Sequence, residues 1–135
     1  MREPDEPSER LVEQRMRNRA MESLETLSEG DEGVRIVGVG EYVNQFFDFI
    51  DDDIPWRWRE WSTFMPDEVA CLDEVHGLLK EACRQTPRDV TDVDFIASGW
   101  PERIQPAAQR ALSLMTARGR FSEAVEEDQP TGHHG

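Results

Sequence analysis

The stretch "EYVNQFFDFI", residues 41–50, decides the fold class. Its polar residues Asn44, Gln45 and Asp48 form only a narrow side when the stretch is read as a helix. A helix that is apolar over most of its circumference must be covered by other elements on more than one side. We therefore predict that it is the buried central element of the fold. The apolar residues that surround it are Tyr42, Val43, Phe46, Phe47, Phe49 and Ile50.

Residues 8–29 predict an amphipathic helix before the aromatic one. Ser8 is a favourable N-cap, because its side-chain oxygen can accept a bond from an N–H group of the first turn. Glu13 and Arg17 are four positions apart and predict a solvent-exposed ion pair. Gly30 and Gly33 are expected to end the helix. Its apolar stripe consists of Leu11, Val12, Met16, Ala20, Met21, Leu24 and Leu27.

Between these helices, "VRIVGVG", residues 34–40, has the residue types of a β-strand. A single strand would leave its backbone hydrogen-bonding groups without partners, so an extended connector is expected instead. Gly38 and Gly40 resemble part of a dinucleotide-binding glycine loop. The third glycine and the flanking strands of that motif are missing, which excludes this interpretation.

Two further helices and a short one are expected after residue 62. Pro66 suits a first helical turn, and the apolar positions Val69, Leu72, Val75, Leu79 and Ala82 follow at helical spacing until Thr86 and Pro87. Thr91 can cap a short helix. The last helix carries Ile104, Ala108, Ala111, Leu112 and Met115. Because proline disrupts a helix interior, Pro106 predicts that residues 101–105 form a separate turn.

These patterns predict an all-α protein: a small single-domain bundle of four to five helices, a buried central aromatic helix and disordered acidic termini. Residues 1–7 are expected to be a flexible lead-in, residues 8–121 the helical domain, and residues 122–135 a mobile acidic tail. Phe121 is the expected anchor of that tail. Length alone allows a domain of 135 residues to bury a core without a disulfide or metal.

The charge composition narrows the classes of partner. A net charge of −14 at pH 7 would repel nucleic acid phosphates and anionic membranes, so neither is an expected partner. Cys71 and Cys83 lie in one predicted helix, about 18 Å apart along its axis, which is beyond disulfide reach. Each is expected to be a small buried residue. With no secretory leader and no apolar run long enough to span a membrane, the sequence indicates a soluble cytoplasmic protein.

The motif search predicts no catalytic residue, no metal site and no cofactor. A calcium loop beginning at Asp51 fails, because Pro55 stands at a ligand position and the turn glycine is missing. Asp73 and His76 share a helix face, but no Glu-x-x-His pair accompanies them, and His76 is expected at the helix surface. His76 is also the sole histidine of the predicted domain, so a nucleophile with a nearby base is not indicated.

The stretch "DDDIPWRWREWS", residues 51–62, holds three of the four tryptophans. Read as a helix, it places Trp58 and Trp61 on the core face, while Trp100 is expected to fill the link before the last helix. Trp56 lies off the core face. Tryptophan and arginine are enriched at interface hot spots, so this stretch is the predicted binding surface. The surface comprises Asp52, Asp53, Trp56, Arg57 and Arg59.

Three functions remain open from the sequence. The leading hypothesis is a non-enzymatic protein-interaction module that binds a basic protein partner, as a bacterial immunity protein, antitoxin or inhibitor does. The first alternative is a small-molecule-binding or enzymatic domain with a pocket lined by Trp56 and the neighbouring Asp and Arg residues. The second alternative is a homo-oligomeric helical scaffold that dimerises through the first helix.

Overall fold

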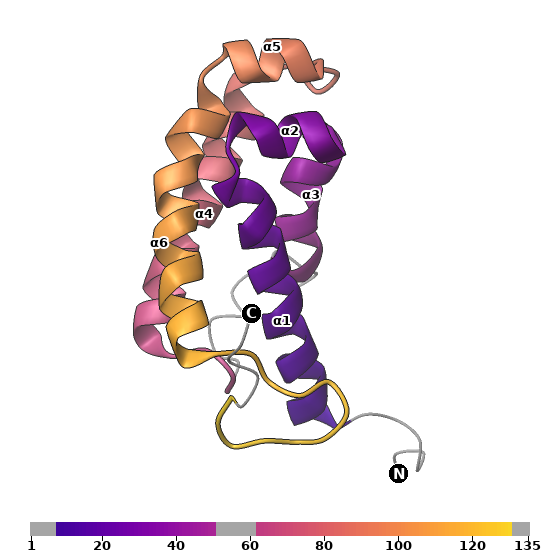
Figure 1. Ribbon diagram of the computed structural model, residues 1–135. Coiled ribbons are helices and arrows are strands. Elements are labelled where there is room, and N and C mark those ends of the chain that lie inside the picture. The colour runs from indigo at the N-terminus through magenta and orange to yellow at the C-terminus, as the bar shows by residue number, and fades with distance from the viewer. Residues whose placement is uncertain (1–7, 51–61, 131–135) are drawn as a thin grey trace.

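The computed structural model describes residues 8–50 and 62–130, and every regular element in these ranges is a helix. The elements are α1 (Glu9–Ser28), α2 (Asp31–Val37), α3 (Val39–Ile50), α4 (Pro66–Gln85), α5 (Asp92–Ala97) and α6 (Trp100–Arg118) (Figure 1). The predicted small all-α bundle is confirmed, with six helices in the described ranges rather than four or five.

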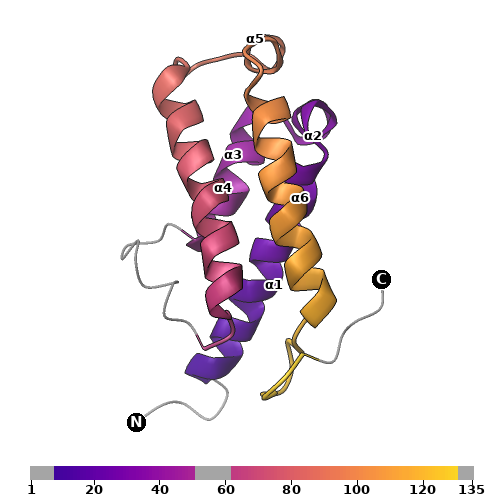
Figure 2. The same cartoon turned by 90° about the vertical axis from the view of Figure 1, so that its left-hand side faces the viewer.

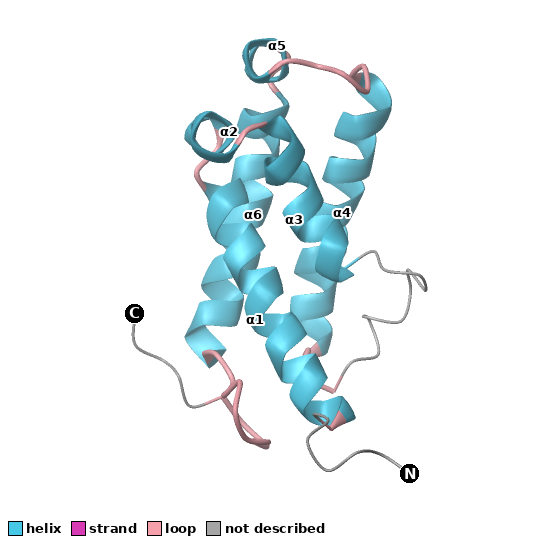
Figure 3. Cartoon of the chain, turned by 90° about the vertical axis from the view of Figure 1, so that its right-hand side faces the viewer, coloured by secondary structure: helices cyan, strands magenta, loops and turns pink. Residues whose placement is uncertain are grey.

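Four long helices run alongside one another, and two short helices close one end. Figure 3 looks along α2 and α5, which cross the direction of α1, α3, α4 and α6. Helix α6 packs against both α1 and α4, and α3 packs against α1 and α2 (Figure 2). Helix α6, which also contacts α2 and α5, therefore packs against more of the described helices than α3, the helix predicted to be central.

The buried apolar residues confirm much of the predicted periodicity. In α3, Tyr42, Val43 and Phe46 are buried, and Phe47 packs partly against them. Trp100 is 5% exposed at the start of α6, as predicted, and the Arg103 guanidinium lies 4.0 Å from its ring centroid. The largest contributors from the other long helices are Met21, Leu24, Leu27, Leu72, Val75, Leu79, Ile104 and Met115.

The prediction of an extended connector at residues 34–40 is wrong. Residues 31–37 form helix α2, and α3 already begins at Val39. Gly30 and Gly38 have φ angles of 61° and 87°, so glycine provides the two sharp turns that bracket a short helix. Two acidic residues in the first turn of α2 favour its N-terminus. These local signals outweigh the β propensity of the valines and isoleucine.

Two other local predictions are corrected. Pro106 lies inside a continuous α6, so residues 101–105 are the first turns of that helix and not a separate turn. Pro106 and Glu102 are both exposed, so water can reach the carbonyl that proline leaves without a helical donor. Gly33 does not end α1 but lies within α2.

The first half of α1 is buried through polar side chains. Gln14, Arg17 and Asn18 are at most 2% exposed, whereas Val12 is 37% exposed. The predicted solvent-exposed Glu13–Arg17 pair is therefore wrong. Arg17 points into the interior because Glu68 and three backbone carbonyls accept hydrogen bonds from it there. Glu13 instead accepts hydrogen bonds from Ser62.

Residues 119–130 follow α6 and lie against the N-terminal half of α1 (Figure 1, yellow). Phe121 is 4% exposed, as the predicted anchor should be. The contacts extend further than Phe121, because α1 side chains also bond the backbone of residues 122–127. The sequence predicted a mobile tail from residue 122 and gave no indication of these hydrogen bonds.

Candidate functional site

The binding surface predicted from the sequence lies outside the described residues. This holds for Asp52, Asp53, Trp56, Arg57 and Arg59, and equally for the expected core residues Trp58 and Trp61 and for the side chains of Phe49 and Ile50. The candidate sites described below therefore come from the remaining surface, where two hollows and one acidic end of the bundle can be described.

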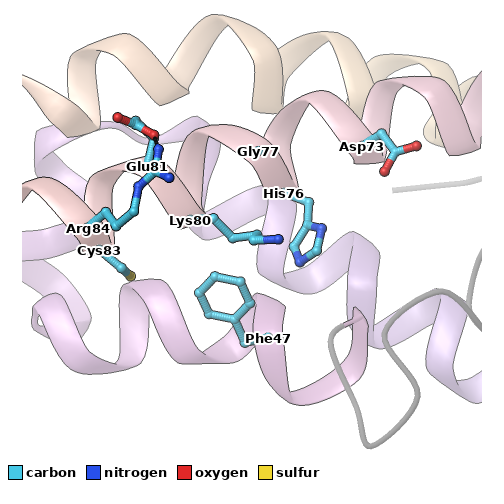
Figure 4. A pocket seen from close by; sticks show the side chains of 8 residues that line it. All are labelled: Phe47, Asp73, His76, Gly77, Lys80, Glu81, Cys83 and Arg84. Atoms are coloured by element: carbon cyan, nitrogen blue, oxygen red, sulfur yellow. Dashed lines mark ion pairs between the residues drawn. The ribbon is translucent and has the colours of Figure 1, made fainter.

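The larger hollow is a groove of about 610 Å³ between α3 and α4. Figure 4 shows Phe47 of α3 facing His76 and Lys80 of α4 across it. The groove carries charges of both signs, and its outer part includes an ion pair between Arg84 and Glu81. Its lining residues are Phe47, Asp73, His76, Gly77, Lys80, Glu81, Cys83 and Arg84.

His76 was expected at the helix surface, and the structure corrects this. The residue is 4% exposed, and its ring stacks on Phe46 at a centroid distance of 6.1 Å. Phe47 meets the same ring edge-on at 5.7 Å. The His76 imidazole is buried because the face of Phe46 and the ring of Phe47 both pack against it. The sequence signal was present, since His76 follows Leu72 by four positions on the buried face of α4.

The groove brings one cysteine, Cys83, onto the same lining as His76. Cys83 lies seven positions after His76 and lines the same groove, but burial of one side of the thiol raises its pKa. A thiol with a raised pKa supplies little thiolate at neutral pH, so Cys83 is a poor nucleophile. Both cysteines are free, and neither is fully buried: Cys71 is half-buried and Cys83 is exposed, contrary to the prediction.

The smaller hollow, of about 430 Å³, lies where α3 meets the segment between α4 and α5. Apolar side chains form most of its wall, and Asp92 accepts a hydrogen bond of 2.8 Å from the Val39 N–H at its edge. Its lining residues are Val39, Gly40, Val43, Asn44, Cys83, Thr86, Pro87, Arg88, Val90 and Phe95.

Beside this hollow, α2 and α5 expose two large aliphatic side chains. Ile36 is 68% exposed and Val93 is 75% exposed, on two helices that contact each other. Two exposed arginines are close in sequence to these residues. Arg35 forms an ion pair with Glu32 at 3.2 Å, and Arg88 precedes α5. We call this surface the acidic end. This end of the bundle is formed by α2, the start of α3, the segment between α4 and α5, and α5, and its exposed residues include Ile36, Val93 and the carboxylates of Glu32, Glu41, Asp89, Asp92 and Asp94.

The described part of the chain shows neither a metal-binding cluster nor a membrane-spanning helix. No group of three or more potential His, Cys, Asp or Glu ligands comes together there, and Asp73 with His76 does not amount to one. None of the described helices combines the length and apolar character needed to cross a bilayer. No protein-family model, curated protein or solved structure matches the chain.

Proposed function

We propose that the protein is a non-enzymatic interaction module of the cytoplasm that binds a basic protein through its acidic end. The observation that carries the proposal is the exposure of Ile36 and Val93 among carboxylates on two contacting helices. Large aliphatic side chains exposed among charged ones are typical of a protein contact site, in which apolar groups lose water and polar groups surround them. The two free cysteines fit a reducing compartment.

The smaller hollow adds a place for a side chain of the partner. Its walls include Val43, Val90 and Phe95, so the aliphatic stem of a lysine or arginine fits there chemically. The carboxylates of Asp89 and Asp92 are exposed close by in the chain, where they can receive the positive head group. The net charge of −14 would also accelerate encounter with a basic protein at low ionic strength. An immunity protein, an antitoxin and an inhibitor are all modules of this kind.

The test is affinity capture by the full chain with a matched pair of variants. Ile36→Glu combined with Val93→Glu should abolish capture of the partner, because two charges would enter the apolar centre. Val12→Glu adds a charge to an exposed aliphatic position at the opposite end of the bundle and should leave capture intact. The captured protein should be basic and should bind more weakly as salt rises. Equal capture by the double variant, or an acidic partner at this surface, would refute the proposal.

A further inference from the structure

Gln14 of α1 bonds the backbone of the C-terminal segment at three points. Its Nε2 atom donates to the Ser122 carbonyl at 2.8 Å and to the Val125 carbonyl at 2.9 Å. Its Oε1 atom accepts from the Glu127 N–H at 2.8 Å. Gln14 is fully buried, so these bonds replace those that its amide would make with water.

Asn18, one turn further along α1, repeats the arrangement. Its Nδ2 atom donates to the Phe121 carbonyl at 2.9 Å, and its Oδ1 atom accepts from the Phe121 N–H at 3.3 Å. Two side-chain amides therefore pair with main-chain groups of one bent, non-helical segment, which is a way to hold a peptide whatever its side chains are. We call Arg10, Gln14, Arg15, Asn18 and Arg19 of α1 the clamp.

The arginines of the clamp add a preference for acidic residues. Arg19 donates to both carboxylate oxygens of Glu123, at 2.7 and 3.0 Å, in the two-pronged geometry that suits a guanidinium. Arg15 donates to the Glu123 carbonyl at 2.9 Å, and Arg10 to the Glu127 carbonyl at 2.7 Å. The clamp thus places positive charge along the path of the bound segment.

An aromatic residue anchors the start of that segment. The guanidinium carbons of Arg10, Arg17 and Arg118 lie 4.9, 5.6 and 5.6 Å from the centre of the Phe121 ring. Three cations around one ring favour an aromatic side chain over an aliphatic one of equal size, because the ring faces are electron-rich. The occupied clamp therefore selects an aromatic residue followed by acidic ones.

We propose that the clamp is a binding site for an acidic peptide of a partner protein, and that residues 119–128 occupy it in the free chain. The chain's own segment has the chemistry of the ligand: Phe121 first, then Glu123, Glu126, Glu127 and Asp128. Exchange is feasible because the segment joins α6 at Gly119, whose φ of 104° marks a glycine turn, and because Val125 is 62% exposed. This site is separate from the acidic end, which lies at the other end of the bundle (Figure 1).

The net negative charge of the chain does not prevent this binding. Charges farther from the peptide than the Debye length of about 8 Å are screened at physiological salt. The bound segment is in direct contact with Arg10, Arg15 and Arg19, so local attraction outweighs the screened repulsion. The chief competitor is the chain's own segment, which is present at a high effective concentration because it is tethered.

The test measures binding of a fluorescent peptide with the sequence of residues 119–130 to the full chain by anisotropy. Phe121→Ala removes the anchor of the tethered segment, so this variant should bind the peptide at least about tenfold more tightly than the unaltered chain. Adding Asn18→Ala to Phe121→Ala should abolish the gain. A peptide with alanine in place of its phenylalanine should bind neither chain.

Glu123→Gln is the second variant, should Phe121→Ala fail to fold, because it weakens the contacts of the tethered segment with Arg19 and Asn18 and leaves Phe121 in place. Glu74→Gln makes the same change in charge on α4 and should leave peptide binding unaltered. If folded Phe121→Ala or Glu123→Gln chains bind the peptide no better than the unaltered chain, the proposal is overturned. It is also overturned if the unaltered chain forms dimers in light scattering that Asn18→Ala dissociates, since the occupant would then be a second copy.

Discussion

The guanidinium of Arg17 on α1 lies 2.8 Å from the carboxylate of Glu68 on α4, and the two side chains are 0% and 1% exposed. The same Glu68 Oε1 atom accepts from Arg118 of α6 at 2.8 Å and from the Met65 N–H at 2.9 Å. One buried carboxylate therefore joins three helices. Burial lowers the pKa of the Arg17 guanidinium, because its charged form loses hydration, while the Glu68 bond opposes that change.

Glu68→Gln should lower the free energy of unfolding by about 3–5 kcal/mol, because it leaves the buried Arg17 and the largely buried Arg118 without a counter-charge. Urea unfolding measures the change. The effect of Arg118→Gln should be smaller, since the Arg118 side chain is 23% exposed and Arg17 still neutralises Glu68. The matched control is Glu74→Gln on the same helix, which breaks an exposed pair with Arg110 and should cost about 1 kcal/mol or less. Equal losses for Glu68→Gln and Glu74→Gln would contradict this interpretation.

The buried polar face of α1 shows where sequence reasoning fell short. Apolar spacing correctly identified the second half of the helix, through Ala20, Met21, Leu24 and Leu27. In the first half, the same face continues through Leu11, Gln14, Arg17 and Asn18, whereas the predicted stripe included Val12 and Met16. Extending the stripe from Leu24 and Met21 at three- and four-residue steps leads to the correct positions. Polarity argued against these positions, because their hydrogen-bond partners lie 46 to 113 positions away in the sequence.

The fold class could be predicted because apolar residues recur at helical spacing along α3, α4 and α6. Features that depend on one or two specific contacts or backbone angles could not be predicted from this spacing. Helix α2 depends on two positive-φ glycines, and the burial of His76 depends on the rings of Phe46 and Phe47. Ile36 and Val93 lie on α2 and α5, two contacting helices that are far apart in the chain, so neither appeared as a candidate in the sequence.

Gly33→Ala should destabilise the protein, because a Cβ atom at residue 33 would lie 2.3 Å from the Thr26 carbonyl oxygen. That distance is impossible without moving the backbone where α1 leads into α2. We expect a loss of about 1–3 kcal/mol, as for other overpacked sites. Gly77→Ala is the control: apart from its chain neighbours and the backbone of its own helix, nothing lies within 4 Å of the added Cβ, and alanine in a helix interior should stabilise by about 0.5–1 kcal/mol. Thermal unfolding of both variants measures the two effects. An unchanged stability of Gly33→Ala would contradict the close approach of residue 33 to the Thr26 carbonyl.

Tyr42→Phe should leave stability unchanged or increase it by about 1 kcal/mol, because the buried hydroxyl has no hydrogen-bond partner and its removal ends a desolvation penalty. The edge-on contact with the Phe95 ring, at 5.8 Å, would remain. Urea unfolding of the variant tests this. A loss of more than about 1 kcal/mol would show that the hydroxyl is bonded in solution.

The same hydroxyl should make stability fall at alkaline pH. Burial raises the pKa of Tyr42, and the nearby Asp31 carboxylate raises it further. Because the pKa of Tyr42 is higher in the folded than in the unfolded chain, the contribution of the neutral hydroxyl to stability is complete below the unfolded pKa of about 10. This contribution is lost as pH rises above that value. Tyr42 is the sole tyrosine, so phenolate absorbance reports this residue alone. We expect the absorbance to appear together with unfolding. Its appearance at about pH 10 in a chain that is still folded would contradict the burial of Tyr42.

Docking of residues 119–128 on α1 should weaken in acid through Glu123. Burial by itself would raise the pKa of this carboxyl, but hydrogen bonds from Asn18 and Arg19 outweigh burial and lower it. Because the pKa of Glu123 is lower in the folded chain, the contribution of its carboxylate to docking is present above the unfolded pKa of about 4.3. This contribution is lost as pH falls through the folded pKa. Amide exchange of Phe121 and Ser122, whose N–H groups are bonded to Asn18 and Glu127, should accelerate in that range relative to the core helices. In Glu123→Gln the exchange should already be faster at neutral pH and should depend less on acid. Identical acid profiles in the two chains would show that Glu123 does not control docking.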